Sequence, residues 1–287
     1  MVVADMIDLP DLEEAKGLQK IVVASLRARG GKMLPRVESG ALWPMTHFGL
    51  DRVSVFQQAT GEQQAQILGI CAQGVLAESY HIEKCGMYFA AKMNLLSEST
   101  EERMLYSVFA ADEATHLSWI SAFVVKEAVE SAREDSFIQQ LQQVIQHENK
   151  AILAYVIQVV LEGWGIQHYR QLAKNCLNPI LQATLIDIVK DEARHHASGL
   201  VLLQEDALQA SLPRVTELMK YFFSAVQTGP LMVVSAVEKT LGHLSLTQKE
   251  KVFAELDCRR QIGDRTQILR ELVQAAPWSG HILGALE

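Results

Sequence analysis

Two short phrases in the sequence each place a carboxylate and an imidazole on one helical face. One phrase, Asp-Glu-Ala-Thr-His, ends at His116, and the other, Asp-Glu-Ala-Arg-His, ends at His195. Each contains a Glu-x-x-His unit, formed by Glu113 or Glu192 with the histidine three residues later. Positions i and i+3 of an α-helix share a face, so the two polar groups of each unit point together. A single unit arises by chance in many helices, but two in apolar runs indicate a common site.

A further glutamate precedes each unit within an apolar helical run. Glu78 lies 113 − 78 = 35 residues before one unit, and Glu162 lies 192 − 162 = 30 residues before the other. Four glutamates and two histidines make six ligands in two similar halves. Carboxylates can bridge two metals and imidazole suits iron, so the set favours paired Fe or Mn/Fe. Zinc sites usually need only three or four nitrogen or sulfur ligands.

The first two candidate ligand helices have clear limits. A helix is expected over residues 61–94, with Glu78 in the centre of its buried stripe. Ser99 with Glu102 three residues later resembles a capping box that opens the second helix. On that helix Glu113 and His116 lie mid-stripe, with apolar turns on either side.

The third and fourth ligand helices are expected to carry Glu162 and the second Glu-x-x-His unit. The pattern of the third runs from about Val144 to Tyr169, and it leaves open whether residues 138–149 form a separate helix. Gly163 and Gly165 follow Glu162 directly, which indicates either a distorted helix or the close approach of another segment. Asn178-Pro179 marks the start of the fourth helix.

The remaining segments are expected to be helices around this core. Residues 12–29 have helical spacing, and turn-forming residues follow up to Gly49. Pro213, Gly229-Pro230 and Gly242 are expected to divide residues 205–287 into shorter helices. No strand alternation is visible. The predicted fold class is therefore all-α, a single domain over residues 1–287 with a four-helix core at about 61–208, extra N-terminal helices, and extra C-terminal helices at about 209–287.

Composition narrows the class of protein. The net charge of −8 argues against a nucleic-acid surface. The N-terminus lacks the features of a signal peptide, and the most apolar run, residues 152–161, is too short to cross a bilayer. Four separated cysteines fit reduced thiols and exclude a zinc ribbon or a rubredoxin-type module. A cytoplasmic protein with no membrane partner is expected.

Residues 65–200 resemble the ferritin-like di-iron carboxylate superfamily, on the strength of the four glutamates and two histidines. That group includes ferritins, rubrerythrins, ribonucleotide reductase small subunits, bacterial multicomponent monooxygenases, acyl-carrier-protein desaturases and arylamine N-oxygenases. The resemblance implies that Glu78, Glu113 and His116 bind one metal. It implies that the second metal is bound by Glu162, Glu192 and His195, and that one or more of the glutamates bridge the metals, with Glu113 and Glu192 favoured for this role.

The resemblance also implies roles for neighbouring residues. Asp112 and Asp191 resemble the family's carboxylates that hold a ligand imidazole by its free N–H; the alternative is that they face solvent. His81 follows Glu78 by three residues, so it is either an extra ligand, a hydrogen-bonding neighbour of the site, or structural. Glu83 and His196 fall off the expected stripes and are assigned to the surface or an interface.

The function implied is that of an O₂-dependent di-iron oxidoreductase, an oxygenase or oxidase similar to arylamine N-oxygenases and bacterial di-iron monooxygenases. Two Fe, or Mn/Fe, would use O₂ to hydroxylate, N-oxygenate or desaturate a small organic substrate. No flavin or iron–sulfur module is visible, so an external electron donor such as a reductase or ferredoxin is expected, and a homodimer is compatible with the sequence. The alternatives are a ferroxidase or iron-handling protein without an organic substrate, and a helical interaction protein with buried polar networks.

Overall fold

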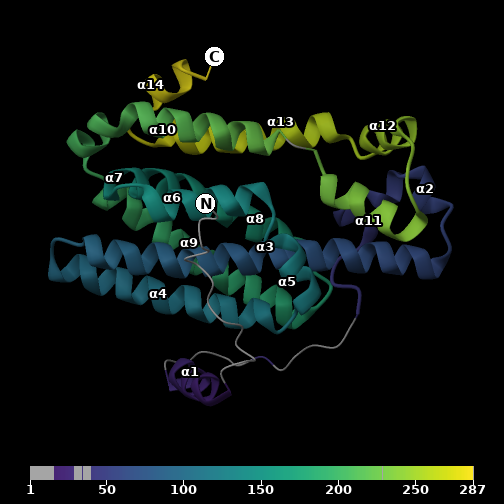
Figure 1. The fold of residues 1–287 in the computed structure, drawn as a ribbon, viewed down its shortest axis with the longest axis horizontal. Coiled ribbons are helices and arrows are strands. Elements are labelled where there is room, and N and C mark those ends of the chain that lie inside the picture. Colours follow the sequence, from purple (N-terminus) through teal and green to yellow (C-terminus); the bar gives the residue numbers. More distant parts are fainter. Residues whose placement is uncertain (1–15, 29–33, 35–39, 228, 287) are drawn as a thin grey trace, which may run out of the picture. The chain divides into compact units, whose positions relative to one another are not determined.

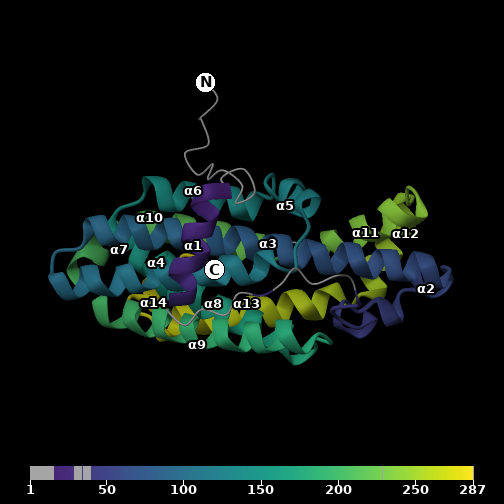
Figure 2. The ribbon, with the colours of Figure 1, turned by 90° about the horizontal axis from the view of Figure 1, so that it is seen from below.

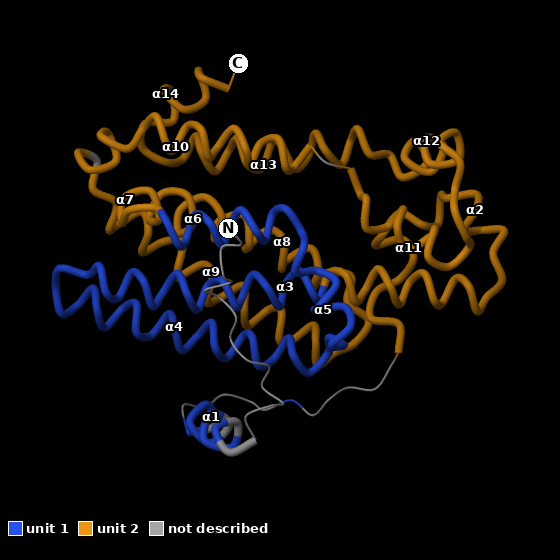
Figure 3. Tube along the Cα trace, in the orientation of Figure 1, with its two compact units in different colours: residues 1–38, 76–147 blue, residues 39–75, 148–287 orange. Residues whose placement is uncertain are grey.

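The structure is a computed structural model that describes residues 16–28, 34, 40–227 and 229–286. All regular elements in these ranges are helical and none is a strand, which confirms the predicted all-α class. The chain divides into two compact units, coloured separately in Figure 3. Unit 1 comprises residues 1–38 and 76–147, and unit 2 comprises residues 39–75 and 148–287. The expectation of a single domain stays a prediction.

Unit 1 is built on a helical hairpin. Helix α3 (Gly61–Leu96), which begins in unit 2, is followed after a short loop by α4 (Thr100–Ser121), and the Phe89 and Tyr106 rings meet edge to face at 6.2 Å. The expected cap is present, since Ser99 Oγ accepts the N–H of Glu102 at 3.1 Å. The other helices of unit 1 are α1 (Lys16–Ala28), α5 (Lys126–Ala132) and α6 (Ser136–His147), labelled in Figure 1. Of the expected helix over residues 12–29, residues 12–15 and 29 lie outside the described residues.

Unit 2 contains the remaining ligand helices. Helices α8 (Glu162–Lys174) and α9 (Pro179–Leu202) lie side by side in Figures 1 and 2. Asn178 opens α9 as predicted, because its Oδ1 accepts the N–H groups of Ile180 and Leu181 at 3.0 Å. The other elements are η1 (Met45–His47), η2 (Leu50–Arg52), α2 (Ser54–Gln57), α7 (Lys150–Leu153), η3 (Ala154–Leu161), α10 (Glu205–Val226), α11 (Leu231–Leu241), α12 (Leu246–Glu255), α13 (Cys258–Ala275) and α14 (Ser279–Gly284).

The structure answers one open question about helix limits and overturns one expectation. The pattern left open whether residues 138–149 form a separate helix; α6 is separate, because it ends at His147 and Asn149 caps a new helix by accepting the N–H of Ile152 at 3.0 Å. Pro213 does not divide the C-terminal region, since it lies inside α10. A proline removes one backbone hydrogen bond, and here tertiary packing outweighs that loss.

Hydrogen bonds join the segment before α2 to the C-terminal end of α8 and the loop that follows it. Trp43 Nε1 donates to Leu172 O at 2.8 Å, and Leu177 N–H donates to Leu42 O, also at 2.8 Å. These bonds satisfy backbone groups near the end of α8 and keep Trp43 buried within unit 2. In the ranges that the structure describes, no helix is both long and apolar enough to cross a membrane.

Candidate metal centre

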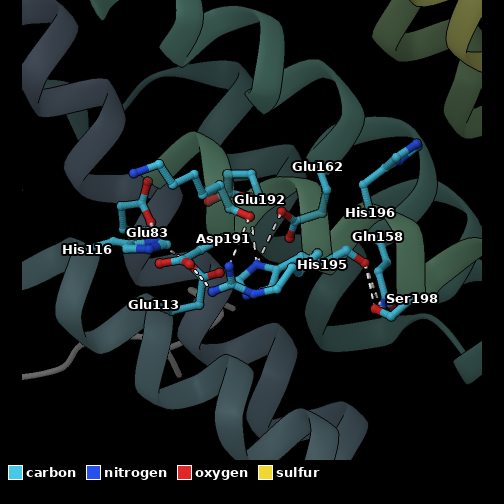
Figure 4. A network of polar contacts seen from close by, with 12 residues as sticks. Glu83, Glu113, His116, Gln158, Glu162, Asp191, Glu192, His195, His196 and Ser198 are labelled. Carbon is cyan, nitrogen blue, oxygen red and sulfur yellow. Dashed lines mark hydrogen bonds and ion pairs between the residues drawn. The ribbon is translucent and has the colours of Figure 1, made fainter. Parts of the chain in front are cut away.

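Unit 1 gathers two carboxylates around one buried imidazole. Nδ1 of His116 lies 3.1 Å from Glu83 Oε2 and 3.9 Å from Glu113 Oε2. One potential ligand atom from each of the three residues lies within 4.8 Å of the other two, and Figure 4 shows the side chains converging. All three side chains are buried, and Glu83 is only 1% exposed. We call this set the unit 1 triad.

The α3 member of this triad is Glu83 and not the expected Glu78. Five residues turn an α-helix by about 140°, so the two glutamates cannot both face α4 in the same way. Glu78 is half-buried, and in the part of the chain that the structure describes it is not a member of either cluster of potential ligands. The assignment of Glu83 to the surface was therefore wrong, since its side chain is buried beside His116, and the ligand role of Glu78 stays a prediction.

A spacing in the sequence could have revealed Glu83. It precedes Glu113 by 113 − 83 = 30 residues, which equals the 192 − 162 = 30 residues between Glu162 and Glu192. The apolar stripe misled the assignment, because α3 is buried on more than one side and Ile82 on the expected stripe is only half-buried.

A glycine on α3 leaves space for the second carboxylate of the unit 1 triad. A Cβ atom added to Gly86 would lie 2.7 Å from Cδ of Glu113 and 3.2 Å from its Cγ. Real Cβ atoms essentially never approach other atoms as closely as 2.7 Å. Gly86 follows Glu83 by three residues and shares its helical face. The glycine therefore lets the Glu113 side chain pack directly against the backbone of α3.

Unit 2 repeats the same arrangement. Nδ1 of His195 lies 3.8 Å from Glu162 Oε2 and 3.8 Å from Glu192 Oε2. Potential ligand atoms of these three residues again lie within 4.8 Å of one another, and Figure 4 shows both carboxylates directed at the ring. Glu192 and His195 are buried, and Glu162 is half-buried. We call this set the unit 2 triad, and it brings together the residues predicted for it.

The geometry of both triads suits a metal ion. Donor atoms that meet a metal at right angles with bonds of about 2.1 Å lie about 3 Å from each other. The separations of 3.1 to 3.9 Å are close to that value, and in both triads the nitrogen that faces the carboxylates is Nδ1. Buried carboxylates are costly unless a cation or hydrogen bonds compensate them. Each group of buried Glu and His side chains could therefore hold a metal ion.

The helix that carries Glu162 is distorted, as one of the two sequence interpretations expected. Residues 154–161 form a π-helix, and the N–H of Glu162 donates to Ile157 O, five residues back. Gly163 permits a close approach, since an added Cβ would lie 3.1 Å from His196 Nδ1, whereas one on Gly165 would meet nothing within 4 Å. π-Helical segments are rare and concentrate at functional sites.

His81, the possible extra ligand, lies away from the unit 1 triad. His81 Nε2 lies 2.9 Å from Val129 O, so this buried ring joins α3 to α5. It lies about 160° around α3 from Glu83, on the side away from the triad, which does not support its role as an extra ligand. Burial lowers the pKa of His81, while its hydrogen bond to the Val129 carbonyl acts to raise it.

The role expected for Asp112 and Asp191, which is to hold a ligand imidazole by its free N–H, stays a prediction. Asp191 forms an ion pair with Arg194, and both Asp191 and Asp112 are half-buried. Glu83, which is not adjacent to a Glu-x-x-His unit, places a carboxylate oxygen 3.1 Å from Nδ1 of His116. His196, expected at the surface or an interface, is half-buried and lies 2.8 Å from Val159 O through its Nδ1.

Comparison with known proteins adds no further assignment: the chain matches no protein-family model, and no curated protein or solved structure is significantly similar to it.

Proposed function

We propose that the two triads are the halves of one di-iron or Mn/Fe centre in a ferritin-like four-helix bundle, and that the protein is an O₂-dependent oxidoreductase. The observation that supports this most is the repetition of the ligand set. Each unit has a glutamate, a second glutamate 30 residues later and a histidine three residues after that. Each set converges around a histidine Nδ1. Helices α3, α4, α8 and α9 would be the four helices of the bundle.

The donor set favours iron or manganese over the common alternatives. Each triad offers two carboxylates and one imidazole without a thiolate, which disfavours a structural zinc site. Four carboxylates and two neutral imidazoles carry a charge of about −4, which two divalent cations offset. When bound, the two metals would supply the reduction of O₂ and the oxidation of a substrate. The protein would supply ligands on four helices and surroundings that exclude water.

The surroundings of the triads support a class of substrate and a source of electrons. Leu185 and Ile188 precede Glu192 on the same buried face of α9, so a substrate beside the cluster would meet apolar walls. The four cysteines are free thiols without a Cys-x-x-Cys pair. Electrons for O₂ reduction would therefore come from an external donor or from the substrate. A small, largely apolar organic molecule is the substrate class that fits best.

Metal analysis tests the proposal directly. Protein produced in medium with added iron and manganese should contain about two metals per chain, as expected for paired carboxylate sites. Glu113→Ala and Glu192→Ala should each lose most of that metal while keeping the helical circular dichroism of the wild type. Reduced, loaded protein should then consume O₂ faster than either variant.

Other outcomes would separate the alternatives. Assembly into a cage that deposits iron mineral would favour the iron-handling alternative over the oxygenase. Wild-type protein without stoichiometric metal, or binding unaffected by both substitutions, would show that the triads are buried polar networks and would reject the proposal.

A further inference from the structure

The side chain of Gln158 joins the π-helix to the backbone of a candidate ligand. Gln158 is fully buried, and its Nε2 donates to His195 O at 3.1 Å and to Ser198 Oγ at 2.9 Å. Ser198 Oγ in turn donates to His195 O at 2.8 Å. A glycine on α9 makes room for this contact, because a Cβ on Gly199 would lie 2.8 Å from Gln158 Cγ. Figure 4 shows Gln158 and Ser198 on the side of His195 away from Glu192.

The next residue on each helix makes the reciprocal contact. His196, on α9, has its Nδ1 2.8 Å from Val159 O on the π-helix. A carbonyl oxygen can only accept, so this bond requires the Nδ1–H form of the ring. A glycine lies beside this contact too, since a Cβ on Gly163 would lie 2.6 Å from Leu272 Cδ2 and 3.1 Å from His196 Nδ1. A side chain of the π-helix (Gln158) thus bonds to the backbone of α9, and a side chain of α9 (His196) bonds to the backbone of the π-helix.

These two bonds flank the contact between Glu162 and His195. Gln158 holds the backbone carbonyl of His195, while Glu162, four residues later, lies 3.8 Å from the ring of the same histidine. Because the N–H of Glu162 bonds to Ile157 O, five residues back, the π-helix sets the rotation of Glu162 about its axis. A change of one residue in that register would turn Glu162 by about 100°, away from His195.

We propose that Gln158 and His196 are positioning residues, which act through the π-helix to hold Glu162 and His195 in register for one metal. This inference rests on the proposed function, because it assigns the unit 2 triad to a metal. The pair holds the backbone of His195 directly and, through Val159 O, the π-helix that leads into Glu162 before any cation arrives. Neither side chain touches the metal in this assignment.

Co²⁺ binding to the purified full-length chain tests the assignment, because the visible absorption of Co²⁺ reports its coordination geometry. Gln158→Met keeps length and removes the donor, and His196→Phe keeps a ring and removes the bond. Each variant should weaken one of two Co²⁺ sites about tenfold and change its absorption, as loss of an outer contact to a ligand does. His196→Asn, which can place an N–H near the Nδ1 position, should restore most of the affinity.

Gln182→Met is the matched control. Gln182 Nε2 donates to Ala173 O at 3.0 Å, so it joins α9 to α8, the helix that continues from the π-helix, at a place away from the unit 2 triad. This control should lower the melting temperature without changing Co²⁺ affinity or absorption. Where Gln158→Met fails to fold, Ser198→Ala provides the second variant and Ser198→Thr its rescue, since Thr retains the hydroxyl.

The outcomes separate this inference from the proposed function. Wild-type affinity and absorption in both Gln158→Met and His196→Phe, or an equal loss in Gln182→Met, would overturn the positioning role alone. A wild-type chain that binds no Co²⁺ would overturn the proposed metal centre and the positioning role with it.

Discussion

Oε2 of Glu83 lies 3.1 Å from Nδ1 of His116, a contact between α3 and α4 that the apolar pattern of α3 does not indicate. It makes the two units alike, because Glu83 stands 30 residues before Glu113 as Glu162 stands 30 before Glu192. The equal spacing gives each half the same three residue types in the same order. A chemistry that needs two similar metal sites in one chain would require such a repetition.

Glu83→Gln should release metal, and Glu78→Gln should not. The amide keeps the size of the side chain but loses the charge that a cation needs, so affinity should fall by more than about 100-fold, since loss of an outer contact to a ligand already costs about 10- to 100-fold. Metal content after dialysis against a weak chelator measures the difference. The reverse result, with loss in Glu78→Gln alone, would restore the assignment made from the stripe.

Gly86→Ala should destabilise unit 1 and disturb Glu113. The added Cβ would lie 2.7 Å from Glu113 Cδ, and such overpacking costs about 1 to 3 kcal/mol, more than the gain of up to about 1 kcal/mol from a better helix former. Gly69→Ala, on the same helix with nothing within 4 Å of the new atom, should instead raise the free energy of unfolding. Urea denaturation of both variants measures the contrast; equal stabilisation would mean that Glu113 packs elsewhere.

Ser79→Ala should stabilise the metal-free protein. Ser79 Oγ is buried and has no hydrogen-bond partner among the described residues. Ser97 Oγ, by contrast, donates to Met93 O at 2.8 Å. Removing the unsatisfied hydroxyl should add about 1 kcal/mol, and Ser97→Ala should cost about 1 kcal/mol. Thermal unfolding measures both effects, and a loss of stability in Ser79→Ala would show that its hydroxyl has a partner in solution.

Acidification should destabilise unit 2 through His47. Burial lowers the pKa of His47 from 6.5 to about 4. Nδ1 of the neutral ring accepts a hydrogen bond from Asn175 Nδ2 at 3.4 Å, which a protonated ring could not do. The unfolded chain then binds a proton that the folded chain excludes, so the free energy of unfolding falls as the pH drops from about 6.5 to about 4.

The size of this effect has an upper limit. A lowering from 6.5 to about 4 corresponds to at most about 3 kcal/mol, and partial exposure of the ring reduces it. Urea midpoints for the wild type and His47→Gln, measured between pH 7 and pH 4, isolate the contribution. Parallel curves for the two proteins would contradict the prediction.

The sequence by itself determined the local features of the site. Glu192 and His195 share the buried face of α9 with residues at spacings of three and four from them, namely Leu181, Leu185, Ile188 and Gly199. Caps at Ser99 and Asn178 were equally readable. These features depend on residues within one or two turns, so their geometry is fixed by the helix itself.

Tertiary structure decided which side of α3 faces α4 and that the residues before Glu162 form a π-helix. Helix α3 is buried on several sides, so its periodicity does not distinguish Glu78 from Glu83, and the helices packed against α3 decide which of them faces α4. Gly86 matters only because Glu113 packs against it. The π-helix is accompanied by bonds to residues more than 30 positions away, from Gln158 to His195 O and between His196 and Val159 O. Long-range contacts of this kind leave no periodic pattern in the sequence. The ligand types could therefore be predicted from the sequence, whereas their register depends on the folded chain.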